Sequence, residues 1–532
     1  MSIPRIEERN GQKILYVNDK PFIMLCGEVH NSSSSSTAYM EPIWQKLKSL
    51  NLNSVLLPIT WQMLEPEEGR FDFSLVDGLI DQARENGMKL GLLWFGSWKN
   101  AQCSYAPAWV KLDKERFPRA EVVKGKIFTQ LPLLRNMPYA TLSAFGEETA
   151  RADAKAFAAL MAHLREIDGE ENTVVMAQVE NETGLLGSAR ERSDLADALF
   201  AKAVPEGLAE FLLDRKDTLA EDVKEALEKN AGGSWSEVFG SAAEEAFSAY
   251  YTAKFVETVA SAGKKEYPLP MSVNCWLPQG GEPGAYPSGG PVARMMEVWQ
   301  YAAPSIDVFA PDIYVPNFCE VCNEYVKLSN PLFIPEAAAH ASAGARELYV
   351  VGHHHAMCYS PFGIEDLGGK VDVSLGETVG MAADDPALQF SQDEKQYARL
   401  NQLLGQLLPL IAERYGTSAV QAVCKEDAEN SLMMFYPAGI KVLFDLPGMI
   451  TAQDGACLAV QTESNEYLIL GCGCFAIPIS LDRSKPYMEY LSIEEGEFDN
   501  GEWRTLRVLN GDEEMLLINE PKLLKVKVNF YS

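Results

Sequence analysis

Thr173-Val-Val-Met-Ala-Gln-Val-Glu-Asn-Glu182 places an apolar run directly before a group of carboxylates. A short apolar run without a polar face is typical of a strand covered on both sides, as in a parallel sheet. A carboxylate at the end of such a strand loses hydration, which costs free energy unless the group has a partner or a task. The sequence therefore predicts a buried strand at 173–178 whose C-terminal end lies in a functional site.

The same texture extends from residue 20 to about residue 415. Helical spacing recurs between the apolar runs, for example at Val76, Leu79, Ile80 and Ala83, where Ser74 is the expected N-cap. Alternating strands and helices indicate βα units, and eight of them make a (β/α)₈ TIM barrel. The other seven predicted strands are 22–26, 54–59, 89–95, 269–273, 308–310, 332–334 and 357–360.

The pattern changes after residue 415. We expect residues 1–415 to form the catalytic barrel, and residues 416–532 to form an all-β, sandwich-like accessory domain, because short alternating runs are separated there by Gly, Asp and Asn. Residues 185–245, after the fourth strand, are acidic and longer than a βα loop requires. This helical insertion is either a solvated excursion or a lid over the barrel mouth.

Composition and charge exclude several classes of function. The chain has 532 residues, with 46 Lys and Arg against 75 Asp and Glu, a formal net charge of −29. Such a field repels phosphate backbones and anionic lipids, so we expect no nucleic acid and no membrane as partners. No apolar run approaches the roughly 20 residues of a spanning helix, and the charged segment 1–9 does not resemble a secretory signal.

The ten cysteines are scattered and do not form a disulfide framework, so we expect a reduced, cytoplasmic protein. Cys319-x-x-Cys322 and Cys472-x-Cys474 have spacings seen in metal sites. Neither has a second pair or a nearby histidine to complete four ligands. We therefore expect no metal site at these cysteines.

Two glutamates at the ends of predicted strands carry the candidate chemistry. Glu182 follows the fourth strand and Glu336 follows the seventh. In a barrel of this type the active site lies at the C-terminal ends of the strands. Two carboxyl groups across a pocket suit glycoside hydrolysis, in which one gives a proton and the other attacks the anomeric carbon. The alternative for each is a structural carboxylate that caps the following helix.

Aromatic residues near the strand ends support a carbohydrate ligand, because flat rings stack on the C–H faces of sugars. A single buried tryptophan is more often part of a core, so the set carries the argument. Asp312 and Tyr314, after the sixth strand, are candidates to hydrogen-bond the nucleophile and keep it ionised. The aromatic set is Trp61, Trp94, Trp98, Trp109, Trp276 and Tyr314.

These residues resemble the clan A glycoside hydrolases, most closely the β-galactosidase families 35 and 42. The Gln-Val-Glu-Asn-Glu segment at 178–182 is similar to the acid/base motif of family 35. The segment 64–73, Leu-Glu-Pro-Glu-Glu-Gly-Arg-Phe-Asp-Phe, and Gly27-Glu-Val-His30 resemble segments of both families. Residues 416–532 resemble the β-rich domain of a bacterial family 35-like subgroup.

The resemblance implies a role for each matching residue. Glu182 would be the general acid/base, Asn181 would contact the sugar 2-hydroxyl, Glu336 would be the nucleophile, and Tyr314 would touch that nucleophile. It further implies a retaining double displacement, with the two carboxyl groups ~5–5.5 Å apart.

One departure concerns the sugar. Family 35 enzymes carry a glutamate at the third strand that reads galactose hydroxyls, whereas this strand runs Leu93-Trp-Phe-Gly-Ser-Trp-Lys99 without a carboxylate. Glu28 or the Lys99-Asn100 pair are candidates to take its place. Cleavage of a β-glycosidic bond is therefore a firmer expectation than the choice of galactose.

Histidines give a weaker signal. His30 and His340 follow strand ends and are candidates for the substrate site, as is Glu365 after the eighth strand. The three consecutive residues His353 to His355 point in different directions on a helix, so we expect solvated side chains and no metal.

The leading hypothesis is a retaining exo-β-glycosidase, a β-galactosidase acting on oligosaccharides without a cofactor. The alternatives are a β-glucosidase or another β-glycosidase, a non-catalytic carbohydrate-binding barrel, and a metal-dependent barrel hydrolase. A homo-oligomer is plausible by analogy with other β-rich accessory domains.

Overall fold

Eight strands form the central sheet, in the order β4-β13-β12-β11-β10-β9-β6-β5, and neighbours run parallel. Its two ends are joined just beyond β4, where Leu56 N donates to Gly27 O (3.0 Å) and Val29 N donates to Leu56 O (3.2 Å). These bonds close the sheet, so the predicted (β/α)₈ barrel is confirmed. The strands are β4 (Met24–Leu25), β5 (Ser54–Thr60), β6 (Lys89–Phe95), β9 (Val174–Val179), β10 (Met271–Trp276), β11 (Val308–Ile313), β12 (Phe333–Ala337) and β13 (Cys358–Pro361).

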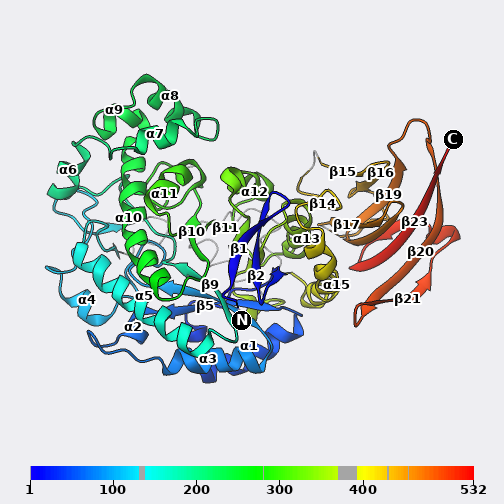
Figure 1. The fold of residues 1–532 in the computed structure, drawn as a ribbon, viewed down its shortest axis with the longest axis horizontal. Coiled ribbons are helices and arrows are strands. Elements are labelled where there is room, and N and C mark those ends of the chain that lie inside the picture. The colour runs from blue at the N-terminus through cyan, green and yellow to red at the C-terminus, as the bar shows by residue number, and fades with distance from the viewer. Residues whose placement is uncertain (1, 131–137, 280, 370–391, 428–429, 453) are drawn as a thin grey trace.

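The structure is a computed structural model that describes residues 2–130, 138–279, 281–369, 392–427, 430–452 and 454–532. In Figure 1 the barrel and its surrounding helices lie on the left, and an all-β region that contains the C-terminus lies on the right.

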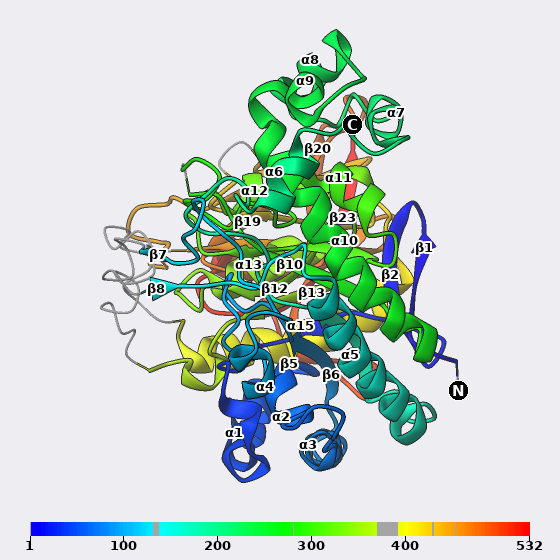
Figure 2. The same cartoon turned by 90° about the vertical axis from the view of Figure 1, so that its left-hand side faces the viewer.

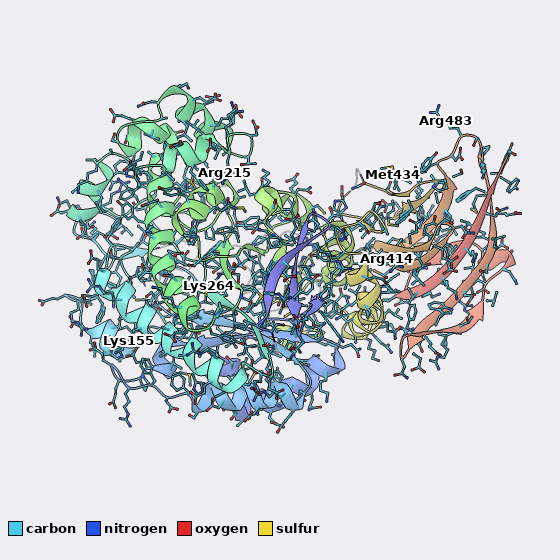
Figure 3. The ribbon with its side chains drawn as sticks, in the orientation of Figure 1. Lys155, Arg215, Lys264, Arg414, Met434 and Arg483 are labelled. Carbon is cyan, nitrogen blue, oxygen red and sulfur yellow. The ribbon has the colours of Figure 1, made fainter. Side chains whose placement is uncertain are left out.

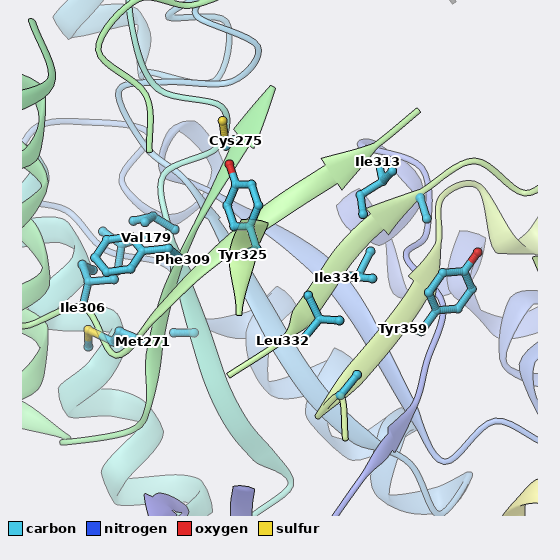
Figure 4. Close-up of a cluster of buried hydrophobic side chains, with 14 of the residues drawn as sticks. Val179, Met271, Cys275, Ile306, Phe309, Ile313, Tyr325, Leu332, Ile334 and Tyr359 are labelled. Atoms are coloured by element: carbon cyan, nitrogen blue, oxygen red, sulfur yellow. The ribbon is translucent and has the colours of Figure 1, made fainter. Parts of the chain in front are cut away.

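Both faces of the barrel strands are covered, which explains their continuous apolar sequences. Leu56, Leu93 and Phe95 share one cluster with side chains of other strands. Leu57 and Trp94, which alternate with them, lie in the cluster that contains the helices. Figure 4 shows part of this buried packing around β9 to β13.

The covering helices follow the predicted periodicity. Helix α3 buries Val76, Leu79 and Ile80. The predicted cap was wrong: Ser74 is the first helical residue, and Asp72 Oδ1 accepts both its backbone N–H (3.0 Å) and its hydroxyl (2.6 Å). The helices of the barrel are α1 (Thr37–Ser49), α2 (Trp61–Leu64), α3 (Ser74–Glu85), α4 (Ala108–Leu112), α5 (Glu147–Asp168), α10 (Ala243–Glu266), α11 (Met296–Ala302), α12 (Phe318–Tyr325), α13 (Ala343–His353) and α15 (Glu394–Glu413), with 3₁₀ turns η1 (Ser33–Ser35), η3 (Gly240–Ala242), η4 (Ala293–Met295), η5 (Lys327–Ser329) and η6 (Ile364–Asp366).

The segment between β9 and α10 carries short helices that project from the barrel (Figures 1 and 2). Trp235 stacks on Phe239 with ring centroids 5.6 Å apart and meets Phe247 of α10 edge-on at 5.3 Å. The segment is therefore packed on α10 through aromatic side chains. Its helices are α6 (Asp194–Phe200), α7 (Leu208–Leu213), α8 (Glu221–Lys229) and α9 (Trp235–Phe239).

The C-terminal region consists of two antiparallel sheets, β14-β17-β18-β23-β20-β21 and β15-β16-β19-β22. Ile440 of one sheet and Ile469 of the other belong to one buried cluster. Two sheets that share a core confirm the predicted all-β region. Its elements are β14 (Val420–Cys424), β15 (Leu432–Phe435), β16 (Ala438–Leu443), β17 (Ala456–Glu463), β18 (Glu466–Cys472), β19 (Cys474–Ser480), β20 (Tyr487–Asp499), β21 (Glu502–Val508), η8 (Gly511–Glu513), β22 (Leu516–Ile518) and β23 (Lys522–Tyr531); smaller sheets are formed by β1 (Arg5–Arg9), β2 (Gln12–Val17) and β3 (Lys20–Phe22), and by β7 (Thr129–Gln130) and β8 (Pro138–Tyr139).

Helices α13 and α15 join the barrel to the β region. Arg346 of α13 donates to Glu426 (2.9 Å), and Arg414, which follows α15, donates through Nε to Gln461 O (3.1 Å). Arg414 lies where the two parts meet in Figure 3. Since side chains of both parts also share one hydrophobic cluster, the β region is packed on the barrel and is not loosely tethered to it.

The histidines at the end of α13 are not solvated, so that prediction was wrong. His353 stacks on Tyr349 with centroids 4.8 Å apart, and its Nδ1 lies 3.3 Å from Ala422 O. Burial lowers the pKa of His354 to about 3 and that of His355 to about 4. The end of α13 packs against β14, a contact that the helix sequence alone does not reveal.

Gly352 on α13 is a point of close approach in this interface. A Cβ there would lie 2.5 Å from Ala422 Cβ and 3.0 Å from Leu458 Cδ1. We expect Gly352→Ala to lower the free energy of unfolding by about 1–3 kcal/mol, because the added atom forces packed elements apart. Urea unfolding measures this change. Gly232→Ala is the matched control, since a Cβ there meets nothing within 4 Å, and equal unfolding midpoints for the two variants would contradict the prediction.

Candidate active site

The predicted acidic residues meet at the C-terminal ends of neighbouring strands. Glu182 lies in the loop after β9, and Glu336 lies within β12. Asp312 of β11 pairs with Glu336 in the parallel register, and Trp276 of β10 pairs with Asp312. The barrel therefore brings side chains from four strands to one place at its mouth.

Glu182 is 4% exposed. Burial raises its pKa to about 7, with a further contribution from the charge of Glu336; Lys99 and a hydrogen bond with Asp312 act in the opposite direction. A carboxyl group with this pKa holds a proton over part of the neutral range, as a general acid requires.

Asn274 positions Glu182 and was missed by the sequence reasoning. Its Oδ1 accepts the backbone N–H of Glu182 (2.9 Å), and its Nδ2 donates to Asp312 Oδ2 (2.7 Å). Asn274 sits in β10, beyond the point where the predicted fifth strand ended. An amide side chain in a buried strand, between Val273 and Cys275, was the signal that could have found it.

Glu336 is held by Tyr314. The Tyr314 hydroxyl donates to Glu336 Oε1 (2.5 Å), while Oε2 is buried without a hydrogen-bond partner among the described residues. Burial and the neighbouring Glu336 raise the pKa of Tyr314 well above its usual value, so the phenol stays protonated as a donor. This hydrogen bond fixes the orientation of the Glu336 side chain.

Lys99 and Glu28 complete the cluster. Burial lowers the pKa of Lys99, but the charges of Glu336, Glu182 and Glu28 together raise it above the usual value. Burial raises the pKa of Glu28 well above its usual range, and Glu336 adds to this effect. The cluster thus holds one ammonium group among carboxyl groups at the mouth.

The turn after Lys99 contacts the segment 180–182 directly. Asn100 (φ 52°) and Ala101 (φ 56°) are both left-handed, and Ala101 N donates to Glu182 O (3.1 Å). Non-glycine residues in this conformation are strained and are held by their surroundings. The loops after β6 and β9 are therefore joined next to the candidate catalytic residue.

Asn181 is placed as a ligand-binding residue would be. Its backbone N–H donates to Trp98 O (3.3 Å), and both polar atoms of its side chain are buried without a partner among the described residues. Buried polar atoms normally have partners, so a bound hydroxyl group would satisfy them.

Comparison with protein families agrees with this arrangement. The glycoside hydrolase family 42 model, described as a β-galactosidase, matches residues 31–206, which include Glu182. This part of the barrel is therefore similar to that glycoside hydrolase family. A second model, described as a domain of unknown function (DUF5597), matches residues 397–519. Among curated proteins the comparison finds no match.

Several solved structures are similar to this chain. The β-galactosidase from Bacillus circulans sp. alkalophilus is 15% identical at a TM-score of 0.46, covering 73% of this chain and 57% of that one. The β-amylase catalytic domain from Paenibacillus polymyxa is 10% identical (TM-score 0.45; 68% and 98% covered). The exo-β-1,4-mannosidase from Opitutaceae bacterium strain TAV5 is 14% identical (0.40; 75% and 62%). This chain thus spans 57% of the length of that β-galactosidase, and the similarities carry no argument about substrate.

The tryptophans that were predicted near the barrel mouth occupy different environments. Trp61 is buried and donates through Nε1 to Glu65 (2.8 Å), so the structure places it in the helix layer. Trp98 is 2% exposed and meets Phe255 edge-on, with centroids 4.5 Å apart. Trp276 keeps exposed surface and packs on the cluster formed by Ala101 and Leu186. Trp276 is therefore the member of this group that is best placed to meet a sugar.

The two candidate histidines are engaged elsewhere. His30 Nε2 lies 2.8 Å from Asp366 Oδ2, and its backbone N–H donates to Glu365 (3.0 Å). His340 Nε2 lies 2.8 Å from Arg346, and burial, with the Arg346 charge, lowers the pKa of His340 to about 3. No hydrogen bond joins either ring to Glu182 or Glu336 in the part of the chain that the structure describes.

Two further features concern metal sites and membrane spans. Within the described ranges, no three His, Cys, Asp or Glu side chains converge as ligands of a metal ion. Nor does any helix of those ranges have the length and apolar character to cross a bilayer.

Proposed function

We propose that this barrel is a retaining exo-β-glycosidase that removes terminal β-galactosyl residues from oligosaccharides. The observation that supports this most directly is the pairing of a proton-bearing Glu182 with Glu336, whose carboxylate accepts a hydrogen bond from Tyr314. Retaining hydrolysis needs these two forms of a carboxyl group in one site.

The reaction proceeds in two displacements. Glu336 attacks the anomeric carbon while Glu182 gives its proton to the departing glycosidic oxygen, which breaks the C–O bond and leaves a glycosyl ester on Glu336. Glu182, now ionised, takes a proton from water, and this water attacks the same carbon and releases Glu336. The buried amide of Asn181 is available to the sugar 2-hydroxyl throughout.

Tyr314→Phe tests the support given to the nucleophile. We expect kcat to fall about 10–100-fold with little change in KM, because a buried Glu336 carboxylate would lose its donor. Steady-state kinetics on an aryl glycoside measure both constants. Tyr325→Phe is a matched control, since that buried hydroxyl donates to Pro291 O (3.0 Å). A Tyr314→Phe enzyme with unchanged kcat would contradict this role.

A second candidate is hydrolysis of another β-glycoside, such as a β-glucoside or β-mannoside. It is favoured by the absence of a carboxylate in the segment 93–99, where Lys99 enters the site instead. An ammonium group donates to hydroxyl oxygens, whereas a carboxylate accepts from hydroxyl hydrogens, so the two groups make different hydrogen bonds with a sugar.

Hydrolysis of nitrophenyl glycosides tests the proposal. The panel contains the β-galactoside, β-glucoside, β-mannoside, β-fucoside, β-xyloside and α-galactoside. Selective β-galactoside turnover with a β-configured first product supports the proposal. Turnover of another β-glycoside would overturn the proposed preference for galactose but leave the proposed mechanism in place. An α-configured first product would refute the retaining mechanism.

A further inference from the structure

A second pair of carboxyl groups lies beneath the acid/base segment. Asp153 of α5 and Glu180 of the loop after β9 are both 0% exposed, and neither takes part in the proposed reaction. The two groups are neighbours, because Asp153 accepts the hydroxyl of Ser97 and Glu180 accepts the backbone N–H of the next residue, Trp98. Two ionised carboxylates buried side by side are unfavourable, so we expect one of them to carry a proton.

The surrounding donors show which one. Asp153 accepts from Trp94 Nε1 at Oδ1 (2.8 Å) and from Ser97 Oγ at Oδ2 (2.5 Å). Glu180 Oε2 accepts the Trp98 backbone N–H (2.8 Å), whereas its Oε1 is buried and receives no other donor among the described residues. A proton on Glu180 Oε1, donated to Asp153, therefore satisfies every polar atom of the pair.

We propose that Glu180, as a neutral acid hydrogen-bonded to the Asp153 carboxylate, is a positioning residue for Glu182. This inference rests on the proposed role of Glu182 as the acid/base. Burial, together with the Asp153 charge, raises the pKa of Glu180 well above its usual value, which agrees with the placement of the proton.

The path from this pair to Glu182 is short. Both backbone polar groups of Trp98 are held: its N–H donates to Glu180, and its carbonyl accepts the N–H of Asn181 (3.3 Å). Glu180 (φ 63°) and Glu182 (φ 45°) are both left-handed, a conformation that non-glycine residues keep only when contacts hold them. Loss of the pair would therefore release the segment that aims the Glu182 carboxyl group.

Two variants of nearly equal volume separate positioning from space filling. Glu180→Gln keeps both bonds, because the amide donates to Asp153 and accepts from Trp98, so we expect kcat within about 3-fold of the wild type. Glu180→Met fills the same space without hydrogen bonds, and we expect kcat to fall about 100-fold while KM stays within about 3-fold. Near-normal kcat in both variants overturns the inference, and so does an equal loss in both.

Thermal unfolding at pH 5 to 8.5 tests the proton without any substrate. The unfolded wild type loses the Glu180 proton above its ordinary pKa while the folded state keeps it, so wild-type stability falls as pH rises; Glu180→Gln has no such proton. We expect the unfolding midpoint of Glu180→Gln, measured relative to that of the wild type, to rise by about 1–3 °C for each unit of increasing pH. Lys99 and Glu182 are common to both proteins, and so is Asp153, whose pKa burial raises and the interaction with Glu180 lowers. A difference between the two unfolding midpoints that does not change with pH overturns the inference.

The kinetic and thermal measurements distinguish a failure of the proposed function from a failure of the inference about Glu180. If the midpoints diverge with pH but the wild type hydrolyses none of the glycosides, the proposed function is refuted and the shared proton stands. If the wild type is active and Glu180→Met retains kcat, the positioning role is refuted and the proposed function stands.

Discussion

Glu336→Gln is expected to lower kcat/KM on an aryl β-glycoside by about 10⁴-fold or more, because a side-chain amide cannot form the glycosyl ester. Steady-state rates at substrate concentrations well below KM measure the change. Glu297→Gln is the matched control: this buried carboxyl group of α11 accepts a hydrogen bond from Thr218 (2.8 Å) and lies outside the carboxylate cluster. The control is expected to retain activity within about 3-fold.

Azide distinguishes a missing nucleophile from a damaged site. Glu336→Ala leaves space beside the anomeric carbon, so azide should restore turnover and yield a glycosyl azide of inverted configuration. Proton NMR of the product reports the configuration. Recovery without inversion, or full activity in Glu336→Gln, would remove Glu336 from the role of nucleophile.

Glu182→Gln should affect substrates according to their leaving groups. Poor leaving groups, such as the sugar of a disaccharide, need a proton, and we expect kcat/KM for them to fall about 10³-fold or more. A dinitrophenolate leaves without one, so the first displacement on that glycoside should be reduced by less than about 10-fold. Pre-steady-state measurement of dinitrophenol release compares the two.

The same residue sets the pH profile. The acid must be protonated, and the pKa of Glu182 is about 7, so wild-type kcat/KM on a disaccharide should fall as pH rises through this value. Glu182→Gln should lack this alkaline limb. A limb that persists in the variant would assign the ionisation to another group.

Much of the barrel could be predicted because parallel strands buried on both faces have continuous apolar sequences. The run 89–95 coincides with β6, and the run 173–178 lies within one residue of β9. The residues after these runs pointed to the mouth, and the structure brings Glu182, Glu336 and Lys99 into one cluster there. A residue that directly follows a strand of a βα unit lies at the barrel mouth, so its place in the sequence was enough to predict its place in the fold.

Other features depend on contacts between segments distant in the chain. Trp61 and Trp276 both lie near strand ends, yet Trp61 is buried in the helix layer and Trp276 keeps exposed surface. His354 was expected in solvent and is buried where α13 packs on β14. Sequence spacing does not show which partner covers a side chain.

The amino-acid sequence by itself determined the barrel, the all-β region and the strand ends at which carboxyl groups collect, because burial on both faces imposes a local pattern on each strand. The protonation states were decided only by the tertiary structure. Glu180 and Glu182 are two residues apart in one loop, yet Glu180 faces Asp153 of α5 and Glu182 faces Glu336 of β12. A pKa depends on desolvation and on charges within a few ångströms, and folding alone selects those neighbours.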